Sequence, residues 1–322
     1  MLGIWATPLE QGLAYGILVL GVYLTFRILN YADLTVDGSF PLGAAIAATA
    51  ITKGIHPAYA TMLGFFGGAL AGTVTGFLNT KLKISSLLAG ILTMTGLYSV
   101  NLRIMGGRSN IPLLREATLV TMAQDKIGFE WGAICLFGFI VVIIKLVLDY
   151  FLHTEIGLGL RACGDNEKMI KALGVDTDLY KIFGLAVANG LVAMAGSIVA
   201  QYQAFADVGM GIGTAVAGLA SVILGEAIIR PKTIWTATLS AVLGSILYRF
   251  TITFALRAGF AATDLRLVTA VLVIFALALP RIKEMKLVKK IAEAKKTTTS
   301  QVVKHKTQPA STLIGSEKHA TD

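Results

Sequence analysis

The sequence predicts an all-α protein that spans a membrane as a polytopic bundle of about nine helices, or eight to ten depending on how interrupted spans are counted. Of its 322 residues, 55% are hydrophobic and only 15% are charged, whereas a soluble domain carries about 25% charged residues. The mean hydropathy is +0.72, and several apolar runs reach the roughly 20 residues that a helix needs to cross a bilayer. An outer-membrane barrel would instead show short alternating segments.

Taken in order, the apolar runs give nine spans with one long polar segment in the middle of the chain. The expected spans are 9–29, 33–52, 57–79, 84–104, 131–152, 179–203, 208–229, 233–256 and 264–280, with a loop at 105–130. They form the first half (9–152) and the second half (179–280) of a membrane domain at 1–290, and a polar loop at 153–178 separates the halves. Residues 291–322 are rich in Thr, Lys and Ser, a composition typical of a disordered tail.

The positive charge of the chain indicates its orientation rather than binding to nucleic acid. The net charge of +9 and the pI near 9.5 owe much to basic residues after Pro280, and basic residues at a membrane exit normally mark the cytoplasmic side. The short basic turns at Lys81 and Arg230 agree with this assignment. We therefore expect a cytoplasmic carboxy-terminal tail, an outer amino terminus, contact with membrane lipid and no nucleic acid.

The sequence contains no catalytic or metal-binding pattern. Cys135 and Cys163 lack metal-ligand spacing, so both are expected to be free and structural. No two of the four histidines have zinc spacing, and there is no Gly-Xaa4-Gly-Lys-Ser/Thr phosphate loop. We expect no catalytic site, no metal and no cofactor in this chain.

Glycines recur on one face of the third span. Gly64, Gly68, Gly72 and Gly76 occur at every fourth residue, which places them on one side of a helix. Such a stripe lets another helix approach closely, so we expect tight helix packing here rather than a ligand site.

The start of the second span is a poor helix interior. Asp37 is charged, Gly38 is flexible and Pro41 lacks an N–H, so a broken or late-starting helix is expected. Interrupted helices expose backbone polar groups that are tolerated only beside protein or a cavity. The seventh span begins in a similar way at Asp207-Val-Gly-Met-Gly211. The candidates for the substrate pathway are Asp37, Gly38, Ser39, Pro41, Asp207, Gly209 and Gly211.

These two stretches also indicate an internal repeat. Asp37, Gly43, Ala45, Ala47 and Ala50 align without gaps on Asp207, Gly213, Ala215, Ala217 and Ala220. The first stretch starts at the inner end of its span and the second at the outer end. The two halves would then be inverted copies with the pathway between them, as in many transporters. Chance matching of Gly and Ala residues is the alternative explanation.

Ionisable residues within spans are costly unless they are paired or face water. The candidates are Asp37, Glu226 and Arg249, with Asp207 at a span edge. Each could line the pathway, or form an ion pair or helix cap. We favour the structural role for Glu226, beside Arg230, and for Asp207. Three amides are expected to hydrogen-bond between helices: Asn79, Asn101 and Asn189.

The loop at 153–178 is the most polar long segment within the apolar part of the chain. Its inner part predicts one short helix from Asn166 to Leu173, capped by Asp165 and stopped by Gly174. The helix carries three apolar residues flanked by two lysines: Met169, Ile170, Leu173, Lys168 and Lys171. Such a helix suits docking into a groove on another protein, and a solvated loop is the alternative.

Four segments of the sequence are similar to those of a known family. They are Asn30-Tyr-Ala-Asp-Leu-Thr-Val-Asp-Gly-Ser-Phe-Pro-Leu-Gly43, Glu155-Ile-Gly-Leu-Gly-Leu-Arg-Ala-Cys-Gly-Asp-Asn166, Ala172-Leu-Gly-Val175 and Asn189-Gly-Leu-Val-Ala-Met-Ala-Gly196. Through these segments the sequence resembles the permease subunits of bacterial ABC importers for branched-chain amino acids and simple sugars. The resemblance covers roughly 10–280 and is closest to a less characterised branch for amino acids or other small organic solutes. Asp33-Leu-Thr-Val36 replaces the aromatic-histidine-glycine pattern of branched-chain members, which leaves the substrate open.

The resemblance implies a multi-pass protein of the bacterial plasma (inner) membrane that is not itself an enzyme. Two permease chains, expected to be a homodimer, would form the pathway. Separate ATPase chains would bind ATP and dock on the loop helix, and an extracytoplasmic solute-binding protein would deliver an amino acid or other small solute. The residues expected at the ATPase are Arg161, Asp165, Asn166, Lys168, Met169, Lys171 and Leu173. Of these, Asp165 would cap the helix, and Met169 and Leu173 would insert into the partner.

Two other functions remain open from the sequence. An ion-coupled secondary transporter would need Asp37 and Glu226 as its ion-binding groups. A non-transporting scaffold or receptor component is the other possibility, and the interrupted spans and the repeat argue against it.

Overall fold

The structure, a computed structural model, describes residues 3–128, 131–259, 267 and 271. Its elements are α1 (Gly3–Tyr23), the π-helical turn η1 (Leu24–Ile28), α2 (Val36–Thr52), α3 (Pro57–Thr80), α4 (Ser86–Ile104), β1 (Asn110–Pro112), α5 (Leu119–Ile127), α6 (Gly132–His153), α7 (Glu155–Asp165), α8 (Glu167–Ala172), α9 (Thr177–Gln203), β2 (Phe205–Asp207), α10 (Thr214–Ile229) and α11 (Ile234–Arg257). Within the described residues, six helices are long and apolar enough to cross a membrane, and α2 and α10 are shorter apolar helices. The predicted helical bundle is confirmed. The predicted span 264–280 and the predicted tail 291–322 lie outside the described residues.

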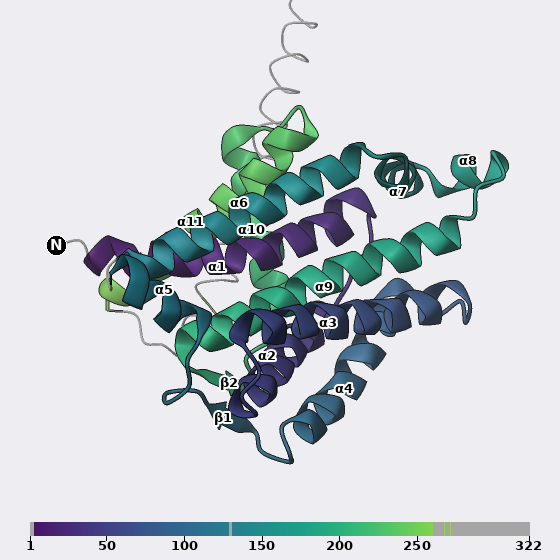
Figure 1. The fold of residues 1–322 in the computed structure, drawn as a ribbon. Helices are drawn as coiled ribbons and strands as arrows, with labels where there is room; N and C mark the ends of the chain where they lie inside the picture. The colour runs from purple at the N-terminus through teal and green to yellow at the C-terminus, as the bar shows by residue number, and fades with distance from the viewer. Residues whose placement is uncertain (1–2, 129–130, 260–266, 268–270, 272–322) are drawn as a thin grey trace, which may run out of the picture. The chain divides into compact units, whose positions relative to one another are not determined.

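Helix α9 lies at the centre of the helix packing, in contact with α3, α2 and α1 (Figure 1). The predicted glycine stripe of α3 explains how close that packing is. A β-carbon added at Gly68 would collide with the carbonyl oxygen of Asn189, and one at Gly72 would collide with that of Leu185. The stripe is therefore a packing surface for α9, as the sequence predicts.

The two ends of the bundle carry different elements. At one end, here called the α8 end, Arg27 pairs with Glu226, and the Lys81 ammonium lies 3.9 Å from the Asp178 carboxylate. Helix α9 starts beside this end and runs to β2, so the short ribbon formed by β1 and β2 lies at the other end, here called the ribbon end (Figure 1). The basic turns that the sequence assigns to one side of the membrane therefore meet at the α8 end.

The region 105–130 is not the simple loop that the sequence predicts. It contains β1 and α5, and β1 pairs antiparallel with β2 so that Asn110 lies opposite Asp207. Thr118 starts α5 with a capping box, in which its side chain accepts from the Thr121 N–H and the Thr121 side chain accepts from the Thr118 N–H. A three-residue strand shows no periodic pattern, so the ribbon is set by its distant partner and not by local sequence.

Helices α2 and α10 both start inside the bundle. They have 17 and 16 residues, which gives lengths of about 25 Å, short of a hydrocarbon core of about 30 Å. The broken or late-starting helix predicted at 35–41 is not found, because α2 is helical from Val36 through Pro41 and continues to Thr52; only 29–35 is not helical. Helix α10 starts at Thr214, six residues later than predicted, because 208–213 form turns.

The gapless repeat alignment matches the local structure only in part. Asp37 lies in the first turn of α2, whereas the aligned Asp207 ends β2. Gly43 lies within α2, whereas the aligned Gly213 precedes α10 with a φ of +86°. The first two aligned pairs therefore differ in local structure, whereas the other three pair residues of α2 (Ala45, Ala47 and Ala50) with residues of α10 (Ala215, Ala217 and Ala220).

Candidate functional site

The Asp37 carboxylate joins the two helix starts. One carboxylate oxygen accepts from the backbone N–H of Gly213 at 3.0 Å, and the other accepts from the Thr214 hydroxyl at 3.0 Å and the Ala215 N–H at 2.7 Å. The N-cap residue of α10 is a glycine without a side-chain acceptor. Asp37 therefore caps α10 from another helix and places a negative charge at the positive end of the α10 dipole.

A cavity of about 290 Å³ opens beside this junction, between α2, α4 and the turns before α10. Its walls are mostly apolar. They are formed by Asp37, Gly38, Pro41, Met94, Thr95, Tyr98, Asn101, Val208, Gly209 and Ile212. An apolar cavity with a few polar groups is the usual form of a small-molecule site. Four of the predicted pathway candidates, Asp37, Gly38, Pro41 and Gly209, come together here.

The other three predicted candidates do not line the cavity, and each has a structural partner. The Ser39 hydroxyl donates to the Asn189 amide oxygen at 2.8 Å. Asp207 accepts from the Gly209 N–H at 2.7 Å, which shapes the turn at the ribbon end. Gly211 packs against the carbonyl oxygen of Asp37, where a β-carbon would collide. Because Pro41 has no N–H, this carbonyl lacks its usual partner within α2.

A buried polar network fixes the start of α2 against α9. The Asn189 amide donates to the Asp33 carboxylate at 2.7 Å, and Asp33 also accepts from the Thr35 N–H at 2.9 Å. Asp33, Thr35, Ser39 and Asn189 are all buried. The predicted interhelical role of Asn189 is confirmed. The sequence prediction did not single out Asp33 as a buried charge, although its place before the start of α2 is a usable signal.

Asn101 of α4 makes the second predicted contact between helices. Its amide nitrogen donates to the Gly38 carbonyl at 3.3 Å. Its amide oxygen is buried and has no hydrogen-bond partner in the described part of the chain. Asn79 instead donates to the carbonyl of Ile84 across the turn after α3, so its bond is local.

Glu226 forms the ion pair expected of it, but with a different partner. Its carboxylate binds the Arg27 guanidinium through two bonds, one of 2.7 Å from Nε, rather than Arg230. Arg249 lies over the ring of Tyr15, with its guanidinium carbon 3.5 Å from the ring centroid. Neither group lines the cavity beside Asp37.

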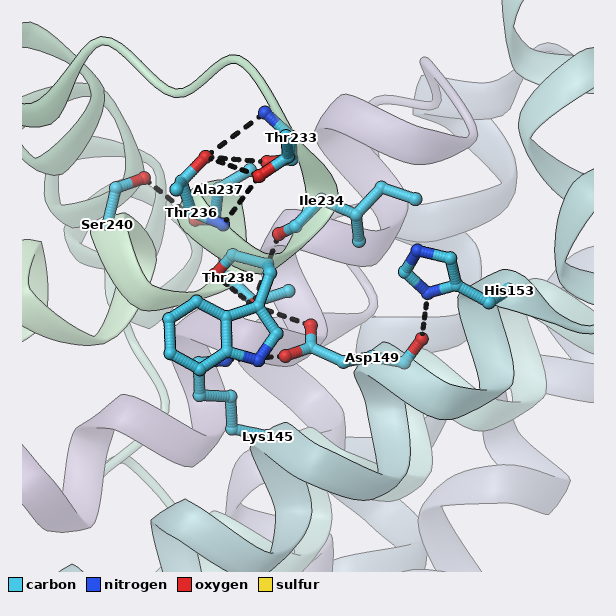
Figure 2. Close-up of polar contacts among 10 residues, drawn as sticks. Lys145, Asp149, His153, Thr233, Ile234, Thr236, Ala237, Thr238 and Ser240 are labelled. Carbon is cyan, nitrogen blue, oxygen red and sulfur yellow. Dashed lines mark hydrogen bonds and ion pairs between the residues drawn. The ribbon is translucent and has the colours of Figure 1, made fainter.

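An ion pair that the sequence analysis did not identify lies within α6 (Figure 2). The Lys145 ammonium lies 2.5 Å from the Asp149 carboxylate, and both side chains are almost fully buried. The Thr238 hydroxyl of α11 donates to the same carboxylate at 2.6 Å, and the ammonium lies 4.0 Å from the centroid of the Trp235 ring. Opposite charges four residues apart in an apolar run would have been a usable signal.

The central loop is mostly helical. The segment Glu155–Asp165, predicted as a loop, forms α7, and Asp165 is its last residue. Asp165 therefore does not cap the next helix. Asn166 does, since its side chain accepts from the Met169 N–H at 3.1 Å. The predicted stop is confirmed, because Gly174 has a φ of +82° and its N–H donates to the carbonyl of Lys171.

Helix α8 exposes apolar side chains while its polar residues hold it in place. Met169 and Leu173 are 57% and 68% exposed, whereas Ile170 is buried against the rest of the chain. Glu167 bridges Lys171 and Lys181 of α9 at 2.7 Å each. These lysines lower the pKa of the Glu167 carboxyl to about 2. Lys168 is exposed.

Arg161 and Asp165 lie at a second cavity, of about 250 Å³, rather than on α8. This cavity lies where η1, α7 and the start of α11 meet, and its lining also includes Arg27 and Lys232. The close contact of α7 with η1 passes through Gly164, where a β-carbon would collide with the carbonyl oxygen of Ile28. The residues predicted for ATPase contact therefore fall on two neighbouring surfaces.

Comparison with known proteins gives a consistent set of relatives. Residues 6–278 match a family described as the permease component of branched-chain amino acid transport systems. A tyrosine transport system permease protein of Clostridioides difficile (strain R20291) is 46% identical over 270 residues, which cover 84% of this chain and 89% of that protein. A ribose import permease protein of Haemophilus influenzae is 28% identical over 209 residues, 64% of each chain. No solved structure matches.

Proposed function

The chain belongs to the permease component family of branched-chain amino acid transport systems, and from this premise we propose that it forms the membrane pathway of an ATP-driven importer for an amino acid. As a member, it is a multi-pass transport subunit and not an enzyme. The observation that carries the proposal is the meeting of two incomplete spans, α2 and α10, at the Asp37 carboxylate beside a cavity. Helices interrupted at membrane depth are the usual form of a transporter substrate site.

We place the pathway on the face formed by α2 and α4. Thr95 and Tyr98 of α4 line the cavity and are exposed in the single chain. A carboxylate such as Asp37 beside lipid would be costly. A second copy of this chain, covering that face, would enclose the cavity and complete the pathway as a homodimer.

We place the ATPase at α8, on the cytoplasmic side with the carboxy-terminal tail. The exposed Met169 and Leu173 would insert into a groove of the ATPase, and Lys168 and Lys171 would lie at the rim. ATP would be bound by that partner, since the sequence has no phosphate loop. A solute-binding protein would then deliver the substrate at the ribbon end.

We infer the class of substrate from related proteins. The tyrosine transport permease named above shares 46% of its aligned residues with this chain, and an amino acid is therefore the favoured cargo. The ion-coupled alternative loses support, because Asp37 caps a helix and Glu226 is bound to Arg27.

The test is recovery of an ATPase with the tagged chain from its native membrane, with Leu173→Asp as the variant. We expect roughly equal amounts of the two proteins with the wild-type chain and at least a tenfold loss with Leu173→Asp. Leu114→Asp is the matched control, because Leu114 is an exposed leucine just after β1, at the ribbon end. Undiminished recovery with Leu173→Asp would contradict docking at α8, and transport without ATP would contradict the importer.

A further inference from the structure

The second cavity, of about 250 Å³, lies where two candidate membrane spans end. The span Trp5–Ile28 ends in its wall, and the span Ile234–Arg257 starts there. Trp235, which directly follows Ile234, is half-exposed, and tryptophans are enriched where a span crosses the boundary between membrane and water. The cavity is therefore at the level of the phospholipid headgroups.

The wall of this cavity is rich in cationic groups. It is mostly polar, and its charged residues are Arg27, Arg161, Asp165 and Lys232. Arg27 is bound to Glu226, but Arg161 and Lys232 form no ion pair within the described residues. Among the described lining residues Asp165 is the one anion, and it is exposed. The wall therefore offers more free positive than negative charge, which attracts an anion.

These groups come together from different elements. The guanidinium groups of Arg161 on α7 and Arg27 on η1 both interact electrostatically with the Tyr23 hydroxyl at the end of α1. The start of α11 completes the wall with Thr233, which caps the helix by accepting from the Thr236 N–H (Figure 2). Because the amino-terminal end of a helix carries a partial positive charge, α11 adds to the positive potential of the cavity.

The phosphate of a phospholipid has the chemistry and the position that this wall requires. A guanidinium such as that of Arg161 binds phosphate through two parallel hydrogen bonds, and an ammonium such as that of Lys232 binds it as a point charge. Basic pockets between membrane helices are typical sites for phospholipid headgroups. Apolar side chains for the acyl chains are exposed on both sides of the wall in the sequence, since Ile228 is 63% and Trp235 is 52% exposed.

We propose that this cavity binds the phosphate of an anionic phospholipid, with Arg161 and Lys232 as its cationic contacts. A lipid with a net negative charge, such as phosphatidylglycerol, is preferred to phosphatidylcholine, because the choline cation of the latter is repelled by Arg161 and Lys232. The bound headgroup bridges α7 and the start of α11, which both contribute to the wall. Neither the transported substrate nor the ATPase takes part in this site.

The test measures lipid binding at Trp235, which is next to the wall in the sequence. Trp5→Phe and Trp131→Phe leave Trp235 as the one tryptophan of the chain, and the purified full chain is placed in phosphatidylcholine vesicles. Phosphatidylglycerol with brominated acyl chains quenches the fluorescence of a tryptophan that it contacts, and brominated phosphatidylcholine is the reference. Quenching at increasing mole fractions gives the relative affinity, and we expect phosphatidylglycerol to bind about tenfold more tightly.

Variants of the wall separate this site from general attraction between basic residues and an anionic membrane. Arg161→Gln and Lys232→Gln should each lower the preference for phosphatidylglycerol to about twofold, since each removes a cation from the wall. Asp165→Asn removes the carboxylate of the wall and should raise the preference. Arg230→Gln is the matched control, because Arg230 is exposed two residues before Lys232 and is absent from the wall. It should leave the preference unchanged.

Several outcomes would overturn the inference. They are equal affinity of the two lipids for the chain with Trp235 alone, an undiminished preference in either Arg161→Gln or Lys232→Gln, and an equal loss of preference in Arg230→Gln. Displacement of phosphatidylglycerol by millimolar inorganic phosphate at constant ionic strength would make a soluble phosphate compound the ligand instead of a lipid. Lower recovery of the ATPase with Arg161→Gln, at unchanged lipid preference, would assign Arg161 to the ATPase surface.

Discussion

Polar and apolar side chains are arranged in opposite ways in the interior of the bundle and on helix α8. Inside the bundle, polar side chains find partners far away in the sequence, as Asp37 does at Thr214 and Ser39 does at Asn189. On α8 the stabilising contacts are mostly local, while the apolar side chain of Leu173 is left exposed. The comparison teaches that buried polar bonds join the helices of the bundle, whereas α8 is held mainly by local contacts and leaves Met169 and Leu173 exposed.

The largest effect on stability is expected from removal of one member of the buried ion pair of α6. This change tests whether buried polar bonds hold the bundle together. Lys145→Met leaves the Asp149 carboxylate buried beside Thr238 without its cation. We expect the free energy of unfolding to fall by about 3–5 kcal/mol. Denaturant unfolding of the purified protein measures the change.

The double variant Lys145→Met/Asp149→Leu is the control for that prediction. It should recover most of the loss, because apolar replacement of a whole buried pair is often nearly neutral. Thr238 keeps hydrogen bonds to carbonyls of its own helix in that variant. A double variant as unstable as Lys145→Met would mean that the pair is not an isolated two-residue unit.

Loss of the cap on α10 should have the next largest effect. Asp37→Leu removes the side-chain acceptors that Asp37 provides at the α10 start, and we expect the free energy of unfolding to fall by about 2 kcal/mol. Asp37→Asn keeps one acceptor oxygen and should lose about half as much. Hydrogen exchange at the Gly213 and Ala215 amides, which donate to Asp37, localises the effect.

Asp207→Asn provides the comparison for the cap. Asp207 accepts from the Gly209 N–H in a turn at the ribbon end, so its variant should leave the protection of Ala215 unchanged. Equal exchange at Ala215 in wild-type protein and Asp37→Leu would show that α10 does not depend on this cap.

The same contrast explains what could be predicted from the sequence. The determinants of α8 lie within about ten residues, so its length, its apolar strip and its stop at Gly174 were predictable, and its cap was misplaced by one residue. Helix α7 was missed because its glycines favour a loop locally. They are compatible with a helix here because Gly157 and Gly164 pack against neighbouring backbone, which is a tertiary effect.

The pathway region was predictable only in part, for the same physical reason. Asp37, Gly38 and Pro41 drew attention to the right region, but they lie in the first turns of α2, so the expectation that they break or delay the helix was wrong. The partners of Asp37 lie more than 170 residues away, and no local pattern encodes such a pairing. The ion pair between Arg27 and Glu226 was not predicted, because Arg230 is the cation closer to Glu226 in the sequence.

The smallest effect is expected where α8 is fastened to α9. Glu167 bonds both Lys171 and Lys181, and these bonds lower the pKa of its carboxyl to about 2. A carboxyl with a lowered pKa stabilises the folded form above its ordinary value of 4.5, and this contribution is lost as the pH falls from 4.5 through about 2. Because exposed ion pairs contribute little to stability, we expect the bonds of Glu167 to add less than about 1 kcal/mol to the free energy of unfolding.

Hydrogen exchange of the α8 amides, compared between wild-type protein and Glu167→Gln at each pH, tests this attachment, because the intrinsic exchange rate cancels in the comparison. The difference in protection should stay constant from pH 7 to about pH 4.5 and shrink towards pH 2.5. Lys168→Met should show no difference from wild type, since Lys168 is exposed and forms no ion pair within the described residues. A difference in protection that does not change with pH would mean that burial of Ile170, and not the charge of Glu167, holds α8 against α9. The exposed side chains of Met169 and Leu173 would then be the one remaining difference between α8 and the bundle interior.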